Sequence, residues 1–594
     1  MFWRGNLDII RLMKASELKK KFLDFFVKKG HRELPNLPLV PENDPTTLFI
    51  SAGMQPLVPY LLGEPHPLGK RLCSLQRCLR TGDIESVGDV FHLTFFEMLG
   101  NWSLGDYWKK ESLSWSYEFL TKVLGLDPRR FHVTIFAGDK NAPKDEESEK
   151  IWLSLGIPPQ RIYPLPKEDN WWEAGATGPG GPDSEIFYDT GKPPCGPNCR
   201  PGDGCGRFFE MWNNVFMEYN RKPDGTYEKL KQKNVDTGMG VERTSVILQG
   251  KTDVFQTDIF EPIIKEIEKI ASKNYQEENQ RPMRIIADHL RAATFLIADG
   301  VMPANVEQGY VLRRLVRRAI RFGRMLQIND LFTPALANRI IETMGKDYPY
   351  LEEKKPLIFQ TLEGEEEKFE KTLKKGLKEM EKYKVLDGKI AFYLYQTYGI
   401  PLEMSEEIAQ ERGQKIEKKS FEEEFKKHQQ LSRKGAGKKF AGGLADHSPE
   451  VIKLHTATHL LQAALRQVLG PHVRQEGSNI TPERLRFDFS HPSPLTEDQI
   501  REVERIINQK IKENLPVKME IMSLKEAKKM GALAFFGEKY GEKVKVYFIG
   551  DYSKEICGGP HVRLTGEIGG VKIIKEQPVG AGKRRIYAQL AHGS

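Results

Sequence analysis

The 594-residue sequence has few cysteines, no long apolar run and only a small excess of charge. Six cysteines are too few for a disulfide framework, which excludes the small disulfide-stabilised secreted folds. No stretch approaches the roughly 18 apolar residues of a membrane-spanning helix, and charges interrupt the first twelve residues too often for a secretory signal. We therefore expect a cytoplasmic protein that binds no membrane, and we assign no function to residues 1–12.

The sequence does contain enough apolar residues, 39% of the total, to form the cores of about three to four domains. Its net charge of +8 permits a polyanionic partner without requiring one. Residues 14–250 are rich in glycine, proline and short strand-like runs, which predicts an α/β domain with an antiparallel sheet. Residues 251–440 carry an apolar residue every three or four positions and predict a helical domain. After a flexible basic linker at 435–443, residues 446–594 predict a separate α+β domain, so the expected fold class is α/β multidomain.

Two segments of the first domain have features of an anion-binding site. Arg80 ends the run QRCLR, where an antiparallel hairpin would lift a side chain off the sheet toward a phosphate. Asp236, Gly238 and Gly240 of VDTGMGVER precede a helix whose first turn carries Arg243, and glycines there let a substrate approach the backbone. Taken alone, Arg80 could equally be a surface charge and DTGMG a tight turn.

Together these segments resemble the bacterial alanyl-tRNA synthetases. The matching stretches are LVPENDPTTLFISAGMQPLVPYLLG, QRCLR, HLTFFEMLGNWSLGDY, ATGPGGPDSEIFYD, MWNNVFMEYNR and VDTGMGVER, which cover most of residues 14–250. The resemblance implies a class II synthetase fold, whose antiparallel sheet binds ATP in a bent form. It also implies a two-step reaction: alanine attacks the α-phosphorus of ATP to give alanyl-adenylate and pyrophosphate, and the 3′-hydroxyl of tRNA(Ala) then takes the alanyl group.

Such a reaction requires little covalent chemistry from the protein. It requires cations that neutralise charge on the phosphates, and residues that hold the alanine carboxylate in line with the α-phosphorus. By resemblance, Arg80 would lie on the α-phosphate and Arg243 near the γ-phosphate or the adenine face, with Mg²⁺ bridging phosphate oxygens. Asp236 would hold the ammonium group of L-alanine. Four residues match positions that shape the amino-acid pocket: Trp172, Asn213, Val215 and Gly238. Because one methylene or hydroxyl is worth only about 1–3 kcal/mol of discrimination, such a pocket rejects glycine and serine poorly, and an editing site is required.

The C-terminal part contains a candidate metal site. His455 and His459 of HTATH stand at i and i+4 on one helix face, and CGGPH adds Cys557 and His561. HTATH alone would more often be ordinary histidines, but three histidines and one cysteine form a tetrahedral set that suits zinc, one ion per chain. The flanking sequences resemble the alanyl-tRNA synthetase editing domain, which implies that Gln475 lines the pocket where seryl- or glycyl-tRNA(Ala) is hydrolysed. The sequence leaves open whether the zinc is catalytic or positional.

The segment GVMPANVEQGYVLRRLVRRAIRFGRM predicts a basic amphipathic helix. Its arginines recur at helical spacing: Arg313, Arg314, Arg317, Arg318, Arg321 and Arg324. Alone, such a segment is more often a solvated helix face. The resemblance implies contact with the tRNA acceptor stem, where a G·U pair would be read by Asn305 and by Glu403, which stands in place of the aspartate of the family.

Three cysteines cluster in CGPNCRPGDGC. Cys195, Cys199 and Cys205, with Asp203 as an incomplete fourth ligand, could hold a structural metal or could be a chance cluster, and the sequence leaves both open.

The β-barrel that normally precedes the editing domain and the C-terminal extension of the family are absent from the pattern. We therefore expect a compact, monomeric form with weaker tRNA binding. Threonyl-tRNA synthetases carry a related His/His/Cys/His set, but their editing module precedes the catalytic one. A free-standing misacyl-tRNA deacylase would leave residues 14–250 without a role, and a non-catalytic tRNA-binding relative would have lost Arg80, Asp236 or Arg243.

Overall fold

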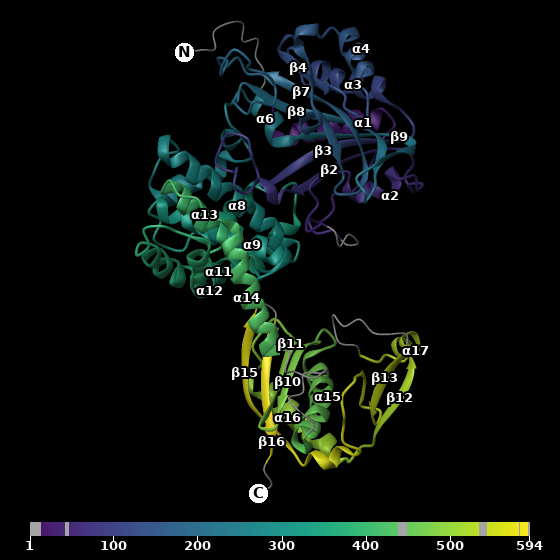
Figure 1. Cartoon of the computed structure of the whole chain (residues 1–594), viewed down its shortest axis with the longest axis vertical. Coiled ribbons are helices and arrows are strands. Elements are labelled where there is room, and N and C mark those ends of the chain that lie inside the picture. Colours follow the sequence, from purple (N-terminus) through teal and green to yellow (C-terminus); the bar gives the residue numbers. More distant parts are fainter. Residues whose placement is uncertain (1–12, 42–46, 437–447, 534–542, 581–582, 592–594) are drawn as a thin grey trace. The chain divides into compact units, whose positions relative to one another are not determined.

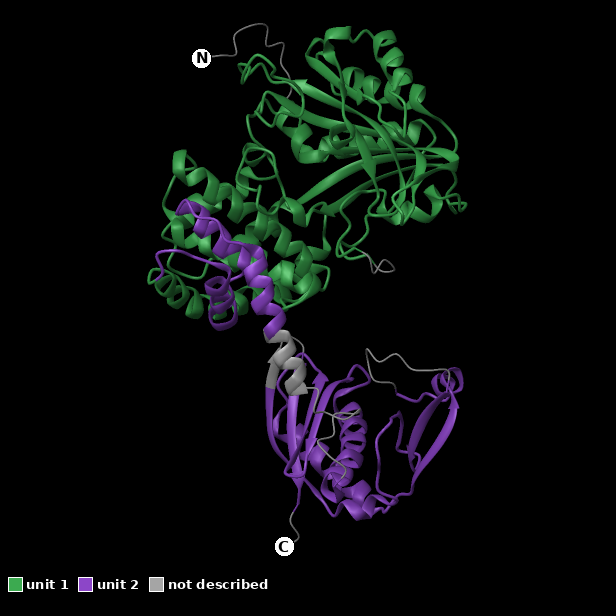
Figure 2. Cartoon of the chain, viewed as in Figure 1, with its two compact units in different colours: residues 1–382 green, residues 383–594 purple. Residues whose placement is uncertain are grey.

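The structure is a computed structural model that describes residues 13–41, 47–436, 448–533, 543–580 and 583–591. The chain forms two compact units, Met1–Lys382 and Tyr383–Ser594 (Figure 1, Figure 2). Most of the predicted linker at 435–443 lies outside the described residues, as do residues 1–12. The division between the units falls inside the predicted helical domain, and the boundaries 14–250, 251–440 and 446–594 stay predictions.

A largely antiparallel sheet forms the centre of the first unit. Its described residues make nine strands in the order β1-β2-β3-β9-β8-β7-β4-β5, with β6 paired to β7. Among these strand pairs, only β1–β2 and β4–β5 are parallel. The strands are β1 (Arg32–Glu33), β2 (Arg71–Leu79), β3 (Phe95–Leu104), β4 (Phe131–Phe136), β5 (Ile162–Leu165), β6 (Trp171–Glu173), β7 (Gly178–Asp189), β8 (Phe208–Arg221) and β9 (Tyr227–Gly240). The predicted antiparallel sheet is confirmed.

Helices cover this sheet, and α1 does so through an apolar stripe. In α1 (Ala15–Lys28), Phe22 and Phe26 are one helical turn apart, and both rings pack on Trp212 of β8, with ring centroids 5.4 and 6.1 Å away. The helices α3 (Lys109–Glu118) and α6 (Val241–Leu248) also pack against β8. The shorter helices are α2 (Val58–Leu61), α4 (Glu146–Ser154) and α5 (Lys167–Asn170).

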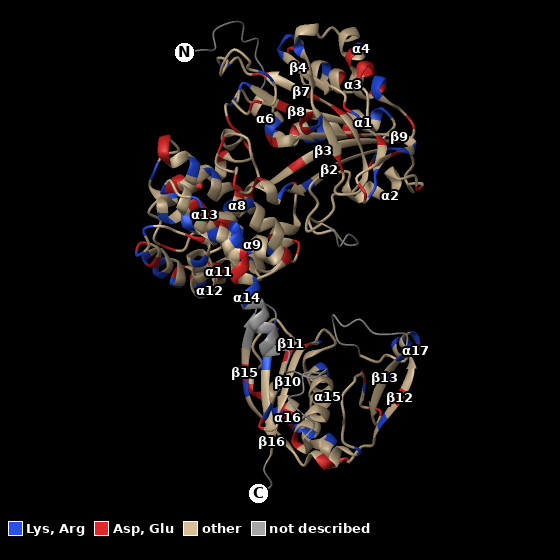
Figure 3. Cartoon of the chain, viewed as in Figure 1, with Lys and Arg blue, Asp and Glu red and all other residues tan. Residues whose placement is uncertain are grey.

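The rest of the first unit is helical, as predicted. Its helices are α7 (Glu261–Ala271), α8 (Gln280–Ala298), α9 (Glu307–Met325), α10 (Thr333–Met344) and α11 (Tyr350–Met380). Helix α8 is buried on nearly all sides because it packs against α9, α11 and strand β3 together. Acidic and basic side chains are interspersed over these helices (Figure 3). No helix among the described residues is long and apolar enough to cross a membrane.

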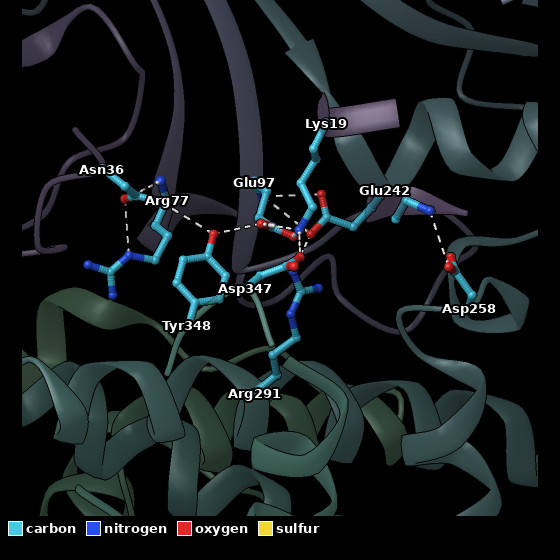
Figure 4. Close-up of polar contacts among 10 residues, drawn as sticks. Lys19, Asn36, Arg77, Glu97, Glu242, Asp258, Arg291, Asp347 and Tyr348 are labelled. Atoms are coloured by element: carbon cyan, nitrogen blue, oxygen red, sulfur yellow. Dashed lines mark hydrogen bonds and ion pairs between the residues drawn. The ribbon is translucent and has the colours of Figure 1, made fainter. Parts of the chain in front are cut away.

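A buried polar network joins these helices to the sheet (Figure 4). The carboxylate of Glu97 on β3 accepts hydrogen bonds from Lys19 Nζ at 2.9 Å and from the Tyr348 hydroxyl at 2.6 Å. The backbone N–H of Glu97 donates to Glu242 of α6, whose carboxylate also pairs with Arg291 of α8. Since buried charges require partners, the network holds α8 against β3 and α6.

The second unit combines helices with two smaller sheets in its described residues. A four-stranded sheet in the order β10-β11-β16-β15 packs against α15 and α16, and a three-stranded sheet has the order β12-β13-β14. This is the expected α+β arrangement. The helices are α12 (Gly388–Tyr398), α13 (Leu402–Glu411), α14 (Lys418–Ala436), α15 (Pro449–Leu469), α16 (Glu497–Lys512) and α17 (Leu524–Lys529). The strands are β10 (Gln475–Thr481), β11 (Arg484–Ser490), β12 (Val517–Ser523), β13 (Lys543–Ile549), β14 (Ser553–Ile556), β15 (Val571–Gly580) and β16 (Lys583–Leu590).

Candidate functional site

A cavity of about 790 Å³ lies over the sheet of the first unit. Its wall contains all the catalytic and substrate-binding residues predicted from the sequence: Arg80, Trp172, Asn213, Val215, Asp236, Gly238 and Arg243. Antiparallel pairing of β8 with β9 brings part of this set together, because Val215 pairs with Asp236 and Asn213 with Gly238. Residues from β6, from the end of β2 and from the first turn of α6 complete the wall.

Asp236 is a buried carboxyl in this wall, with 7% of its surface exposed. Its Oδ1 accepts a hydrogen bond from Trp102 Nε1 at 2.7 Å. Burial raises the pKa of Asp236 to about 7, although the Trp102 hydrogen bond acts in the opposite direction. A cation beside such a group restores its charged form, so this position favours a ligand with a positive charge.

Apolar side chains and a glycine lie close to Asp236 in the cavity wall. Val215 is buried in an apolar cluster with Trp102 and Trp172. A Cβ atom added to Gly238 would lie 2.9 Å from Met98 Sδ, so any larger residue there would displace Met98. Gly238 therefore lets Met98 pack closely against this part of the cavity wall.

Two arginines lie in the same wall. Arg80 follows β2 directly; its Nε donates to the carbonyl oxygen of Ser51 at 3.2 Å, and its guanidinium lies 4.9 Å from the ring centre of Phe96. Arg243 pairs with Glu210 and lies 5.7 Å from the ring centre of Phe91. Stacking and single hydrogen bonds orient both planar groups, which suits the bidentate binding of phosphate.

An acidic group in this cavity was not foreseen from the sequence. Asp183 and Glu185 alternate along β7 and so share one face of the sheet, and Glu210 of β8 lines the same cavity. Burial raises the pKa of Asp183 to about 7, and burial together with repulsion from Glu210 and Asp183 raises that of Glu185. Carboxyls that repel one another favour a divalent cation. The sequence signal for this acidic group was the alternation of two acidic residues in DSE, residues 183–185, within a predicted strand.

The second unit brings together His455, His459, Cys557 and His561. One ligand atom of each lies within 4.8 Å of the others, so these residues form a candidate metal site, which we call the His/Cys cluster. The two histidines of α15 are buried, and Cys557 follows β14 directly. Burial opposes ionisation of the Cys557 thiol, but the neighbouring imidazoles of His455, His459 and His561 outweigh it and lower its pKa to about 2.

Hydrogen bonds around the His/Cys cluster orient all three imidazoles in the same way. His455 Nδ1 donates to the carbonyl of Pro560 at 2.9 Å, and His459 Nδ1 lies 2.9 Å from the Glu555 carboxylate. The Thr456 hydroxyl donates to a backbone carbonyl and therefore accepts from Nδ1 of His561. Each Nε2 then faces the centre of the cluster: Nε2 of His455 lies 3.4 Å from Cys557 Sγ, and Nε2 of His561 is buried with no hydrogen-bond partner among the described residues.

The predicted tRNA-binding residues are neither among those that line the cavity nor part of the His/Cys cluster. Asn305 is exposed in the loop before α9, and its Oδ1 accepts a hydrogen bond from Arg313. Arg314 pairs with Glu85. Glu403 lies in α13 of the second unit, and Gln475 is the first residue of β10.

The predicted helix α9 forms, but its arginines do not make one solvated face. Arg318 and Arg321 are only 6% and 5% exposed. Arg318 donates to the carbonyl of Ile84 at 2.7 Å, and Arg317 pairs with Glu365 of α11 at 2.7 Å. The helix therefore stabilises the first unit as well as presenting charge, which periodicity alone did not indicate.

Comparisons with known proteins identify the family. Residues 17–467 match the protein family described as "tRNA synthetases class II (A)". Residues 544–587 match the family described as "Threonyl and Alanyl tRNA synthetase second additional domain". The alanine–tRNA ligase of Treponema denticola is 56% identical over 97% of this chain and 99% of its own length. The alanine–tRNA ligase of Treponema pallidum is 52% identical over 97% of this chain and 98% of its own length. The alanine–tRNA ligase of Borrelia hermsii is 54% identical over 97% of this chain and 100% of its own length. The chain belongs to the alanine–tRNA ligase family.

Membership of the alanine–tRNA ligase family confirms the predicted class II fold and the predicted reaction. The family activity is ATP-dependent attachment of alanine to tRNA, with editing of mischarged tRNA. The additional domain follows the class II domain along the chain, which is the order expected for this family rather than for threonyl-tRNA synthetases. A free-standing deacylase is excluded because the match extends over nearly the whole chain.

Proposed function

We propose that the cavity of the first unit activates L-alanine with ATP and that the His/Cys cluster of the second unit edits mischarged tRNA(Ala). The observation that supports the first assignment is that seven residues expected from separate segments line a single cavity. The buried carboxyl, the apolar wall of Trp172 and Val215 and the two arginines provide the three elements that an amino acid and a polyphosphate require.

In the proposed alanine site, Asp236 binds the ammonium group. Asn213 Oδ1 is buried without a hydrogen-bond partner among the described residues, so it is a second acceptor for that group. Trp172, Val215 and Gly238 limit the length of the bound side chain. The amino acid is thereby held by its charge and its size.

In the proposed ATP site, Arg80 donates to the α-phosphate and Arg243 lies at the γ-phosphate or the adenine face. Asp183, Glu185 and Glu210 are a carboxylate set that fits Mg²⁺, because their mutual repulsion falls when a dication lies between them. Mg²⁺, when bound, neutralises charge on the phosphate oxygens. As the alanine carboxylate forms its bond to the α-phosphorus, the bond to the pyrophosphate oxygen breaks, and the arginines stabilise the charge that develops.

Alanine activation should depend on pH through Asp236. Burial raises the pKa of this carboxyl to about 7 in the free protein, and only the ionised form pairs with an ammonium group. At saturating Mg·ATP we expect kcat/KM for alanine, measured by ATP–pyrophosphate exchange, to fall about tenfold per unit as pH drops below about 7. A flat profile between about pH 5.5 and 7 would contradict the assignment.

In the proposed editing site, His455, His459, Cys557 and His561 hold one zinc ion. The donor set fits: one thiolate and three Nε2 atoms, of which that of His561 is buried, has no hydrogen-bond partner among the described residues and would gain one in a metal. Zinc, when bound, supplies a Lewis acid beside the mischarged ester. Glu555 and Pro560 fix the imidazole orientations, and Gln475 lines the pocket that receives the seryl or glycyl group.

Cys557→Ala should separate the two activities. Removing one of four ligands weakens zinc binding, so deacylation of seryl-tRNA(Ala) should fall at least about 100-fold while alanine-dependent ATP–pyrophosphate exchange changes less than about twofold. His472→Ala, an exposed histidine of the same unit, is the control and should leave both rates unchanged. Loss of both activities in Cys557→Ala would mean that the two sites are not independent.

For tRNA selection, we propose that Asn305, Arg313, Arg314 and Glu403 contact the acceptor stem. Exposure of Asn305 and its hydrogen bond from Arg313 support this assignment, since the pair presents an amide and a guanidinium side by side. Contacts from arginines to phosphates position the stem, and the amide reads a base edge.

Asn305→Ala should weaken discrimination at the G·U pair. With the unaltered protein, tRNA(Ala) carrying G·C at that pair should be charged about 5–150-fold less efficiently, because a base-edge contact is worth about 1–3 kcal/mol. In Asn305→Ala this ratio should approach one, as measured by kcat/KM for aminoacylation. Asn329→Ala, an exposed asparagine after α9, serves as control. An unchanged ratio in Asn305→Ala would show that another residue reads the pair.

We also propose that the chain acts as a monomer in the cytoplasm. Its substrates, ATP, alanine and tRNA, support that location. Sedimentation velocity at micromolar concentration measures the oligomeric state, and a dimer would contradict this part of the proposal.

A further inference from the structure

Three cysteines meet in the loop that connects β7 to β8, outside both sites described above. The Sγ atoms of Cys195, Cys199 and Cys205 all lie within 4.8 Å of one another. Sγ of Cys199 is 3.8 Å from that of Cys205, and Sγ of Cys195 is 3.8 Å from Oδ2 of Asp203. All three are free cysteines.

These separations match a tetrahedral metal site. With metal–sulfur bonds of about 2.3 Å, two thiolates of a tetrahedron lie about 3.8 Å apart, as Cys199 and Cys205 do. A disulfide would instead bring the sulfurs to about 2.05 Å. The spacing of Cys195 and Cys199, with three residues between them, is one that structural zinc sites use.

The loop backbone is shaped to gather these ligands. Gly202, Gly204 and Gly206 have φ values of +91°, +66° and +77°, which side chains other than glycine rarely adopt, and these turns return Cys205 to Cys199. The backbone N–H of Arg200 donates to Oδ2 of Asp203 at 2.7 Å and so holds the oxygen that lies 3.8 Å from Cys195 Sγ.

We propose that Cys195, Cys199, Cys205 and Asp203 bind a second zinc ion with a structural role. Three thiolates and one carboxylate fill a tetrahedral shell and select a thiophilic divalent cation over Mg²⁺ or Ca²⁺. The site closes the hairpin whose strands carry the acidic group of the cavity, near the pairs Asp189–Phe208 and Tyr188–Phe209. Its role is to fix the register of β7 against β8.

Metal analysis of the full chain tests this proposal. The double variant His459→Ala, Cys557→Ala lacks two ligands of the His/Cys cluster and leaves the hairpin unchanged. By inductively coupled plasma mass spectrometry we expect about two zinc ions per unaltered chain and about one in this variant. Adding Cys199→Ser and Cys205→Ser should remove the remaining ion, whereas adding Cys78→Ala, at a buried cysteine of β2, should not.

Two results would overturn the proposal. One is a double variant that is folded by circular dichroism and holds no zinc. The other is a metal-free double variant in which thiol titration after unfolding without reductant finds two fewer thiols than its sequence contains, which would indicate a disulfide. The count of two in the unaltered chain rests on the proposed zinc of the His/Cys cluster, but the double variant lacks that site, so failure of the proposed function would change the first count and leave the second unaffected.

Discussion

Replacing Asp236 by asparagine should nearly abolish alanine activation. Asparagine has the same shape and can still accept the hydrogen bond from Trp102 Nε1, so the wall of the cavity should keep its form. The change removes only the negative charge that pairs with the ammonium group. Losing one partner of a buried charged pair costs about 2–5 kcal/mol, so kcat/KM for alanine should fall about 30- to 5,000-fold in ATP–pyrophosphate exchange.

The matched control for Asp236→Asn is Asp224→Asn, which makes the same change in an exposed turn before β9. It should leave exchange within about twofold of the unaltered protein. Deacylation of seryl-tRNA(Ala) should be normal in both variants, because it depends on the second unit. If Asp236→Asn retained exchange within about threefold, another group would have to bind the ammonium.

Replacing Arg291 by methionine should destabilise the first unit strongly. Arg291 is fully buried, pairs with Glu242, and lies 4.7 Å from the ring centres of both Phe95 and Phe260. Methionine fills similar space but leaves the Glu242 carboxylate buried without its cation. Breaking a buried pair in this way costs about 3–5 kcal/mol, which corresponds to about 6–10 °C in the unfolding temperature of a large domain.

Differential scanning calorimetry on the full chain measures this effect. Arg339→Met is the control, since the Arg339 side chain on α10 is 39% exposed and pairs with the exposed Glu342 and with the less exposed Glu266, and ion pairs that water reaches contribute about 1 kcal/mol or less. Arg291→Lys retains the charge and should recover part of the loss. An unfolding temperature within about 2 °C of the unaltered protein in Arg291→Met would show that the pair is dispensable.

The sequence was sufficient to predict the antiparallel sheet and the residues of the main cavity. Strand-like runs and glycine-rich turns are local signals, and β8 and β9 pair as expected for neighbouring strands. Resemblance to a family supplied the reason why segments as distant as Arg80 and Arg243 should converge. Neither the local signals nor the family resemblance predicted the acidic group of Asp183, Glu185 and Glu210. Matching whole motifs does not reveal that acidic residues alternate along one strand and so share one face of the sheet.

The surroundings of α9 could not be predicted from its periodicity. A helical arrangement of arginines looks the same whether water or protein lies beyond it, and the pairing carboxylate of Glu365 is 48 residues from Arg317 in the sequence. Arg318 can be buried because the backbone carbonyl of Ile84, far away in the sequence, accepts a hydrogen bond from its guanidinium. Long-range partners of this kind are set by tertiary packing, which a single sequence does not encode locally.

The hydrogen bond between Trp102 and Asp236 makes an indole part of the proposed alanine site. Indole emission responds to charge and hydrogen bonding beside the ring, and an ammonium group at Asp236 would change both. All eight tryptophans precede residue 213, so the tryptophan fluorescence of the whole chain comes from the first unit. Occupancy of the alanine site can therefore be followed optically in the unlabelled protein, while the second unit contributes no tryptophan emission.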